Sequence, residues 1–320
     1  MAVVEEEYPR DLMELEANFA TEGACRAYLT RLRWPAGFRC PHCGSGKAWP
    51  VRGLWECSGC GCQTSVTAGT IFQDTRTPLP VWFRAMWWVT TQKNGASALG
   101  LQRVLGLREY RTAWTMLHKL RRAMVRPGRD LLTGRVEVDE CYIGGLEESL
   151  PGRLNVDKAL VVVAAQEDGP GIGRIRMRQI ITASAANLMP FVEESVQRGS
   201  VIHTDGWQGY MPLERIGYEH EVTVVSRKKK TASELLPRVH QVVALLKRWL
   251  LGTHQGAVRQ KHLDYYLDEF TFRFNRRRSR SRGKLFFRLA QQAVAIDPTT
   301  YNQIVHPHSE KPQTQSVGAT

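Results

Sequence analysis

Four cysteines in the first fifth of this 320-residue chain have the spacing of a structural metal site. Cys40 and Cys43 form one CxxC pair, Cys57 and Cys60 form a second, and thirteen residues separate the two pairs. Two thiolates on each of two tight turns suit the tetrahedral coordination of Zn²⁺. Disulfides are the alternative, but seven cysteines without a signal peptide indicate a reducing compartment and favour zinc.

Two further donors, His42 and Cys62, lie close to these pairs. A structural zinc site takes four ligands, so we expect His42 and Cys62 to be packing or turn residues.

Two aspartates could support divalent-metal chemistry. Asp139 lies in an alternating stretch, where it faces away from Val138, and Asp205 directly follows the apolar residues 201–204. An acid within one strand can meet an acid at the end of a neighbouring strand, which suits Mg²⁺. Aspartates at strand ends are also common without a metal, so spacing alone leaves both interpretations open.

Hydrophobic periodicity predicts the elements that hold these groups. Helical spacing covers residues 11–32, and turns with short strands follow up to residue 70. The later part predicts an α/β domain with a mixed sheet. Its expected strands are 135–143, 158–166, 175–182, 200–204 and 220–224, and its helices are 185–197, 235–251 and 261–275.

Residues 97–105 and 110–124 predict two helices joined by a turn at Gly106, and the second is basic through Arg111, Lys119, Arg121 and Arg122. This pattern is typical of a DNA-binding helix-turn-helix. An ordinary helical hairpin has the same pattern.

The formal net charge of +13 indicates a polyanionic partner, and nucleic acid is the usual one. Part of the charge is concentrated at Lys228, Lys229 and Lys230 and in residues 276–284. No apolar run is long enough to span a membrane, and the first residues are acidic, so we expect a cytoplasmic protein.

Several motifs resemble one family. The cysteine pairs occur with VDECYIGG at 138–145, HTDGWQGY at 203–210 and LKRWLLGTHQG at 246–256. Together they resemble the zinc-ribbon insertion-sequence transposases of the DDE superfamily, which have an ISXO-like transposase domain.

This resemblance implies a ribonuclease-H-like catalytic domain whose two aspartates, here Asp139 and Asp205, bind Mg²⁺ or Mn²⁺ with a third residue. The third residue is usually a glutamate seven positions before a lysine. Here the lysine is Lys247, and His240 stands at the glutamate position. Imidazole suits Mn²⁺ better than Mg²⁺. His240 is either the third ligand or a lost ligand, and Glu234 is the nearest upstream acid.

The resemblance implies that Lys247 binds a phosphate near the scissile bond. The plainer interpretation is that Lys247 is a solvated lysine on a helix. The resemblance extends to Glu269, Arg273 and Arg276, which share one helical face. These residues are either a surface ion pair or a group beside the active site or DNA. Arg277 is a further candidate DNA contact.

We therefore expect a helical segment at 1–34, a zinc ribbon at 35–76, a helix-turn-helix region at 77–126, a catalytic domain at 130–295 and a disordered tail at 296–320. The resemblance implies a DNA transposase that binds the terminal inverted repeats of its element as a dimer or larger oligomer, then cleaves and transfers strands. The alternatives are a non-enzymatic DNA-binding regulator, an inactive transposase relic and a nuclease or resolvase of the same fold.

Overall fold

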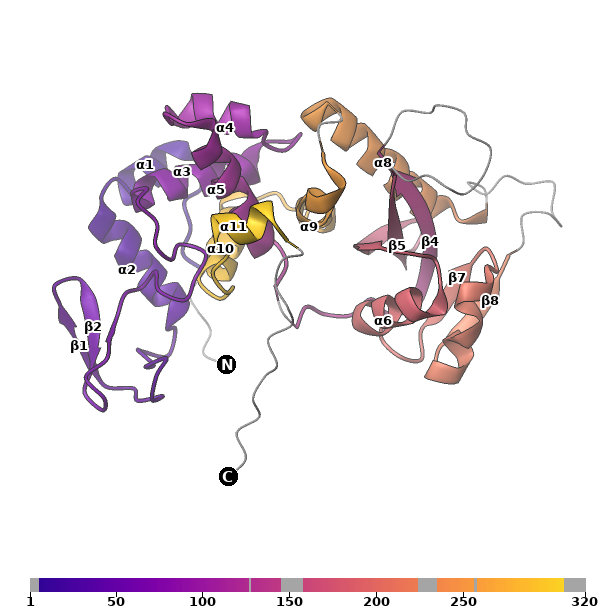
Figure 1. The fold of residues 1–320 in the computed structure, drawn as a ribbon, viewed down its shortest axis with the longest axis horizontal. Coiled ribbons are helices and arrows are strands. Elements are labelled where there is room, and N and C mark those ends of the chain that lie inside the picture. The colour runs from indigo at the N-terminus through magenta and orange to yellow at the C-terminus, as the bar shows by residue number, and fades with distance from the viewer. Residues whose placement is uncertain (1–5, 127, 145–157, 224–234, 256–257, 308–320) are drawn as a thin grey trace. The chain divides into compact units, whose positions relative to one another are not determined.

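The computed structural model describes residues 6–126, 128–144, 158–223, 235–255 and 258–307 (Figure 1). The chain divides into two compact units. The first, here called the ribbon unit, contains residues up to Arg126 together with those from Arg280 onward. The second, the sheet unit, contains the residues between them.

The ribbon unit combines a small three-stranded sheet with a group of helices. The strands β1 (Ala48–Val51), β2 (Leu54–Cys57) and β3 (Gln63–Thr64) pair antiparallel in that order. The helices are α1 (Leu12–Asn18), α2 (Glu22–Arg33), α3 (Leu79–Thr91), α4 (Ala98–Leu105), α5 (Tyr110–Ala123), α10 (Arg282–Ala293) and α11 (Tyr301–Val305). The Thr21 and Ser97 side chains cap α2 and α4, which explains why these helices begin there.

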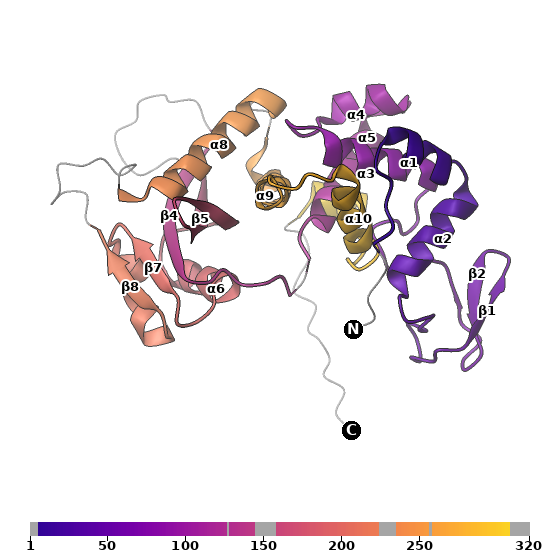
Figure 2. The same cartoon turned by 180° about the vertical axis from the view of Figure 1, so that it is seen from behind.

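Helix α10 corrects the expectation that the catalytic domain extends to residue 295. It packs on α2, α3 and α5 of the ribbon unit. The fully buried Phe286 ring lies 5.7 Å from the Phe83 ring and 5.9 Å from the Phe19 ring, measured between centroids. These apolar contacts assign α10 to the aromatic core of the ribbon unit, and Figure 2 shows the ribbon of α10 from behind.

The expectation of a disordered tail from residue 296 is also wrong in its first part. Residues Tyr301–Val305 form α11, which begins with a capping box between Thr300 and Gln303 and buries Ile304. Residues 308–320 lie outside the described residues.

Helices α4 and α5 occur where the sequence predicted them. Gly106 ends α4 in the left-handed conformation at φ 62°, and the two helices pack against each other. A pair of packed helices does not by itself establish a helix-turn-helix, which therefore stays a prediction.

The sheet unit is built on a five-stranded mixed sheet with the strand order β6-β5-β4-β7-β8. The strands are β4 (Arg135–Ile143), β5 (Ala159–Asp168), β6 (Gly171–Ile180), β7 (Val201–Thr204) and β8 (Glu219–Val222). The strands β4, β5 and β6 pair antiparallel, whereas β7 runs parallel to β4 and to β8. The mixed α/β architecture is thus confirmed, with β4 at its centre.

Helices cover both faces of this sheet (Figure 1). One face packs against α8 (Pro237–His254) and α9 (Leu263–Asn275) through an apolar cluster that includes Val161, Val163 and Leu246. The other packs against α6 (Ala185–Ser195) and the 3₁₀ helix η1 (Gln208–Ile216). Alternate residues of β4 therefore point toward α8 or toward α6.

Candidate metal and catalytic sites

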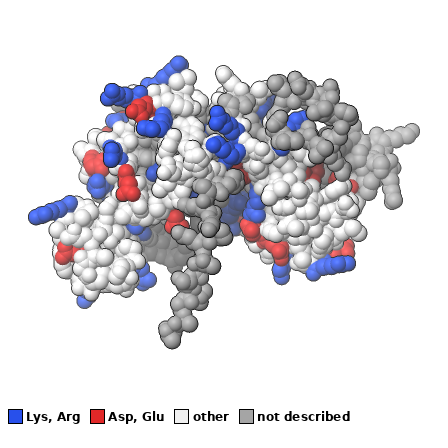
Figure 3. All heavy atoms as spheres, in the orientation of Figure 1, with Lys and Arg blue, Asp and Glu red and all other residues white. Residues whose placement is uncertain are grey.

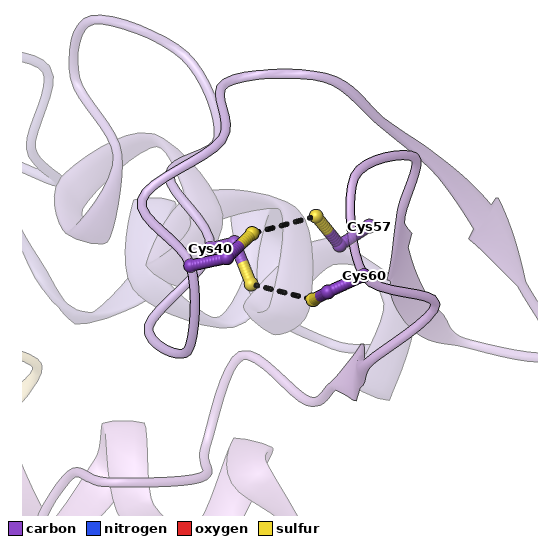
Figure 4. Close-up of side chains that lie close together, drawn as sticks. Cys40, Cys57 and Cys60 are labelled. Carbon is purple, nitrogen blue, oxygen red and sulfur yellow. Dashed lines mark hydrogen bonds between the residues drawn. The ribbon is translucent and has the colours of Figure 1, made fainter.

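The four cysteines of the CxxC pairs converge between two similar turns. All four sulfur atoms lie within 4.8 Å of one another, and Figure 4 shows the side chain of Cys40 facing those of Cys57 and Cys60. The first turn closes with the Gly44 N–H donating to the Cys40 carbonyl, and the second with Gly61 donating to Cys57, both at 2.9 Å. Both glycines have positive φ, at 74° and 69°. That conformation favours glycine and lets each turn fold back toward its sulfurs.

The sulfur separations fit a tetrahedral metal site. The Sγ atoms of Cys40 and Cys60 are 3.7 Å apart, and those of Cys43 and Cys57 are 3.5 Å apart. A Zn–S bond of about 2.3 Å predicts S···S separations of roughly 3.8 Å, whereas a disulfide requires about 2.05 Å. Burial opposes ionisation of Cys57, but the N–H groups of Gly59 and Cys60 lower its pKa to about 6. The donor set therefore fits Zn²⁺, and the disulfide alternative fails.

His42 and Cys62 lie at the edge of this cluster. Their donor atoms and that of Cys60 also lie within 4.8 Å of one another, and all three residues are exposed or partly exposed. Four buried or converging thiolates already complete a tetrahedron, so His42 and Cys62 are surplus to it.

Asp139 lies at the centre of the sheet unit. It pairs with Val163 of β5, and its carboxylate is on the α8 side, whereas the neighbouring Val138 is buried in the cluster on the α6 side. Helix α8 brings His240 over this strand, with its Nε2 3.6 Å from the Asp139 Oδ2. Alternation and helix placement thus bring together two residues that are 101 positions apart in the sequence.

Asp205 follows β7, the strand next to β4, and accepts a hydrogen bond from the Trp207 N–H at 2.9 Å. Burial raises the pKa of Asp139 to about 6, and the negative charge of Asp205 contributes to the increase. The two carboxylates are therefore close enough to repel each other, which is the usual condition of paired carboxylates that bind a cation.

His240 presents an unpaired nitrogen to this site. Burial lowers the pKa of His240; the negative charge of Glu137 opposes this and the positive charge of Lys247 adds to it, and the net lowering leaves the imidazole neutral at pH 7. Its Nε2 is buried and has no hydrogen-bond partner among the described residues. A neutral imidazole beside the Asp139 carboxylate fits a divalent ion such as Mn²⁺.

Taken as a set of three, the donor atoms of Asp139, Asp205 and His240 lie farther apart than the cysteine sulfurs of the ribbon. Within the part of the chain that the structure describes, sets of three or more donors within 4.8 Å occur only at the ribbon. Asp139, Asp205 and His240 therefore do not form a cluster as tight as that of the cysteines. Lys247 lies two turns further along α8, and Glu234 lies outside the described residues.

Two carboxylates of β4 were not predicted to have partners. Glu140 points to the α6 side and accepts a hydrogen bond from the buried Tyr210 hydroxyl. Burial raises the pKa of Glu140 to about 7. Glu137 is 2% exposed and forms an ion pair with Arg238 at 3.0 Å. The only available signal was alternation, which places Glu137 on the same face as Asp139.

The candidate DNA contacts have different environments. Arg111 and Arg122 are exposed and Lys119 is partly exposed, but Arg121 is 2% exposed and donates to the Ala96 carbonyl. Arg121 therefore stabilises the α4–α5 region rather than facing a groove, which corrects its assignment. Lys228, Lys229 and Lys230 lie outside the described residues.

The arginines near the end of α9 have protein partners. Arg273 pairs with the fully buried Glu269 at 2.8 Å, so this pair is buried and is not the surface ion pair considered from the sequence. The Arg276 guanidinium lies 4.1 Å from the centroid of the Phe272 ring. Arg277 donates to the carbonyls of Ile172 and Gly173. Arg273 and Arg276 thus contact residues of α9 itself, whereas Arg277 connects the end of α9 to β6.

Two family models match parts of this chain. Residues 131–275 match the model of the ISXO2-like transposase domain, and residues 20–63 match that of the transposase zinc-ribbon domain. Neither a curated protein nor a solved structure matches the chain. No helix among the described residues is long and apolar enough to cross a membrane. The protein therefore carries an ISXO2-like transposase domain of the DDE class, preceded by a transposase zinc-ribbon domain.

Proposed function

We propose that this protein is a DNA transposase that binds the terminal inverted repeats of its insertion sequence and catalyses metal-dependent strand cleavage and strand transfer. The observation that carries the proposal is that, within the ISXO2-like transposase domain, the His240 Nε2 lies 3.6 Å from the Asp139 carboxylate and the charge of Asp205 acts on the same carboxylate. The strand order, with three antiparallel strands followed by two strands parallel to the first, supports a ribonuclease-H-like domain.

In this proposal, Asp139, Asp205 and His240 hold Mg²⁺ or Mn²⁺. Such ions activate water or a 3′ hydroxyl for in-line attack and stabilise the leaving oxygen. The side chains keep the required charges: Asp139 is ionised above about pH 6, and His240 is neutral and can offer its Nε2 lone pair. Lys247, on the same face of α8, binds a phosphate close to the scissile bond.

We assign DNA recognition to the ribbon unit. The partly exposed face of α5 presents Arg111, Thr112, Thr115 and Lys119 at helical spacing, and these residues line a hollow of about 430 Å³. Figure 3 shows Lys and Arg side chains gathered over the part of this unit where Figure 1 places α4. Basic and hydroxyl groups around a hollow suit phosphate oxygens, and Arg122 extends the basic face. Helix α5 is then the recognition helix of a helix-turn-helix.

Further DNA contacts are assigned to Lys228, Lys229, Lys230 and the arginines at the end of α9, of which Arg277 lines a hollow of about 320 Å³. Handling both element ends requires at least a dimer on DNA.

The test is joining of a labelled duplex that carries the flanking repeat to plasmid DNA, with Mn²⁺ or Mg²⁺. Asp139→Ala is compared with Glu193→Ala, which removes an exposed glutamate of the same unit that forms an ion pair with Arg198. Joining by the wild type and by Glu193→Ala, but not by Asp139→Ala, supports a transposase. Specific binding without joining in the wild type indicates a regulator or relic, and cleavage without joining indicates a nuclease.

A further inference from the structure

The first turn of α8 is held by a carboxylate from the central strand. Pro237 occupies the first helical position and has no N–H, and the N–H of His240 donates to the Leu236 carbonyl at 3.2 Å. The two donors between them belong to Arg238 and Val239, and both donate to Glu137 Oε2, at 2.7 and 3.0 Å. Every N–H of this turn is thereby satisfied, although the N-cap residue Leu236 offers no side-chain acceptor.

The Arg238 side chain strengthens this attachment. Its guanidinium donates to Glu137 Oε1 at 3.0 Å, to Glu167 Oε1 at 2.5 Å and to the Gly169 and Gly171 carbonyls of the β5–β6 hairpin. Glu137 and Arg238 are 2% and 15% exposed. A negative charge at a helix N-terminus also interacts favourably with the helix dipole. Glu137 and Arg238 thus fasten the start of α8 to β4 and to the hairpin.

This attachment sits next to the proposed metal site. Glu137 precedes Asp139 by two residues, so both carboxylates lie on the same face of β4. Val239, which donates to Glu137, immediately precedes His240. The rest of α8 is held by the buried apolar residues Val242, Leu246 and Leu250. Loss of Glu137 should therefore release the first turn, where His240 lies, more than the remainder of the helix.

We propose that Glu137 is a positioning residue that holds His240 against Asp139 and thereby sets the divalent-metal affinity of the site. The inference rests on the proposed function. The hydrogen bonds of Glu137 go to the turn that precedes His240, and its negative charge also acts on the imidazole, whose pKa it raises against the effect of burial. Groups that orient metal ligands in this way commonly change metal affinity by about 10- to 100-fold when they are removed.

The test measures Mn²⁺ binding to the full-length, zinc-loaded protein by calorimetry or electron paramagnetic resonance, without DNA. Glu137→Gln keeps the shape of the side chain but removes its charge and one acceptor. We expect it to weaken Mn²⁺ binding at least tenfold. Glu193→Gln is the matched control, because this residue of α6 forms an exposed ion pair with Arg198, and the variant should bind Mn²⁺ like the wild type.

The same comparison in a His240→Ala background separates positioning from general structural damage. If Glu137 acts through His240, Glu137→Gln should change Mn²⁺ affinity less than twofold once His240 is absent. An equal loss in both backgrounds, or unchanged affinity with His240 present, overturns the inference. If circular dichroism shows that Glu137→Gln does not fold, Glu137→Asp replaces it with the same expectations, because the shorter carboxylate withdraws from α8.

Asp139→Ala separates this inference from the proposed function. Mn²⁺ binding that Asp139→Ala abolishes but Glu137→Gln leaves intact refutes only the positioning role. Mn²⁺ binding that Asp139→Ala also leaves intact refutes both.

Discussion

Replacing Gly283 with alanine tests the assignment of α10 to the ribbon unit. Gly283 is the second residue of α10, and the N-terminal segment crosses directly over it. An added Cβ would overlap the Pro9 carbonyl oxygen and would lie 2.7 Å from Cδ2 of Tyr8. The obstacle is backbone, which cannot rotate away as a flexible side chain can, so residues 8–9 must move off the helix.

The size of the effect is the balance of two opposing contributions. In an exposed helix interior, alanine is more favourable than glycine by about 1 kcal/mol, and the difference is smaller in the first turn of a helix. Overpacking in a well-packed region costs about 1–3 kcal/mol. Displacing the segment also disturbs the contact between the Tyr8 and Phe287 rings, which are 6.2 Å apart. We therefore expect Gly283→Ala to lower the free energy of unfolding of the ribbon unit by about 1–2 kcal/mol.

Thermal unfolding followed by tryptophan fluorescence provides the assay, because seven of the nine tryptophans belong to the ribbon unit. The expected loss lowers the melting temperature by roughly 2–8 °C. Gly252→Ala is the control: this glycine lies in α8, and nothing lies within 4 Å of its added Cβ. It should stabilise the sheet unit by about 0.5–1 kcal/mol. A Gly283→Ala protein as stable as the wild type would refute the close approach of residues 8–9 to α10.

Three further outcomes are expected. Cys57→Ser should lose the zinc of the ribbon, measured as metal released per chain. Cys62→Ser should retain the zinc, because Cys57 belongs to the four-thiolate cluster and Cys62 does not. His240→Glu should raise the rate of strand joining with Mg²⁺ relative to Mn²⁺, and an unchanged ratio would argue against histidine ligation. Burial, helped by Lys261 and Arg259, lowers the pKa of His262 to about 4. Because the unfolded chain takes up this proton first, stability should fall between about pH 6.5 and pH 4, by up to about 3 kcal/mol, and His262→Gln should flatten that part of a urea-denaturation profile.

Local patterns predicted the sheet unit well. Residues 135–143 alternate and residues 159–168 are mostly apolar, and both strands occur where periodicity placed them. The CxxC spacing was equally informative, because tetrahedral coordination restricts how four thiolates can be spaced.

Tertiary contacts explain what the sequence did not reveal. Residues 276–284 read as a basic block, yet α10 begins at Arg282 and buries Phe286 among rings contributed from the other end of the chain. Arg121 looked like its basic neighbours on α5, but its position on that helix turns it toward the Ala96 carbonyl. Helical periodicity shows that a helix has a buried face, but it does not identify the elements that cover that face.

The candidate site likewise has residues that local patterns indicate and a residue that only tertiary contacts reveal. The aspartates were found because they end or interrupt strands, whereas Glu137 looks in sequence like any other polar residue of an alternating strand. Its importance depends on a helix that begins 100 residues later and lacks its own N-cap side chain.

The return of α10 to the ribbon unit has a consequence for protein synthesis. A ribosome delivers residues 1–126 early, but the Phe286 ring that completes their aromatic core emerges only after the whole sheet unit has been made. Nascent chains should therefore complete the sheet unit before the ribbon unit. A product truncated after residue 279 would retain the entire candidate catalytic site but would lack the helix that closes the ribbon unit.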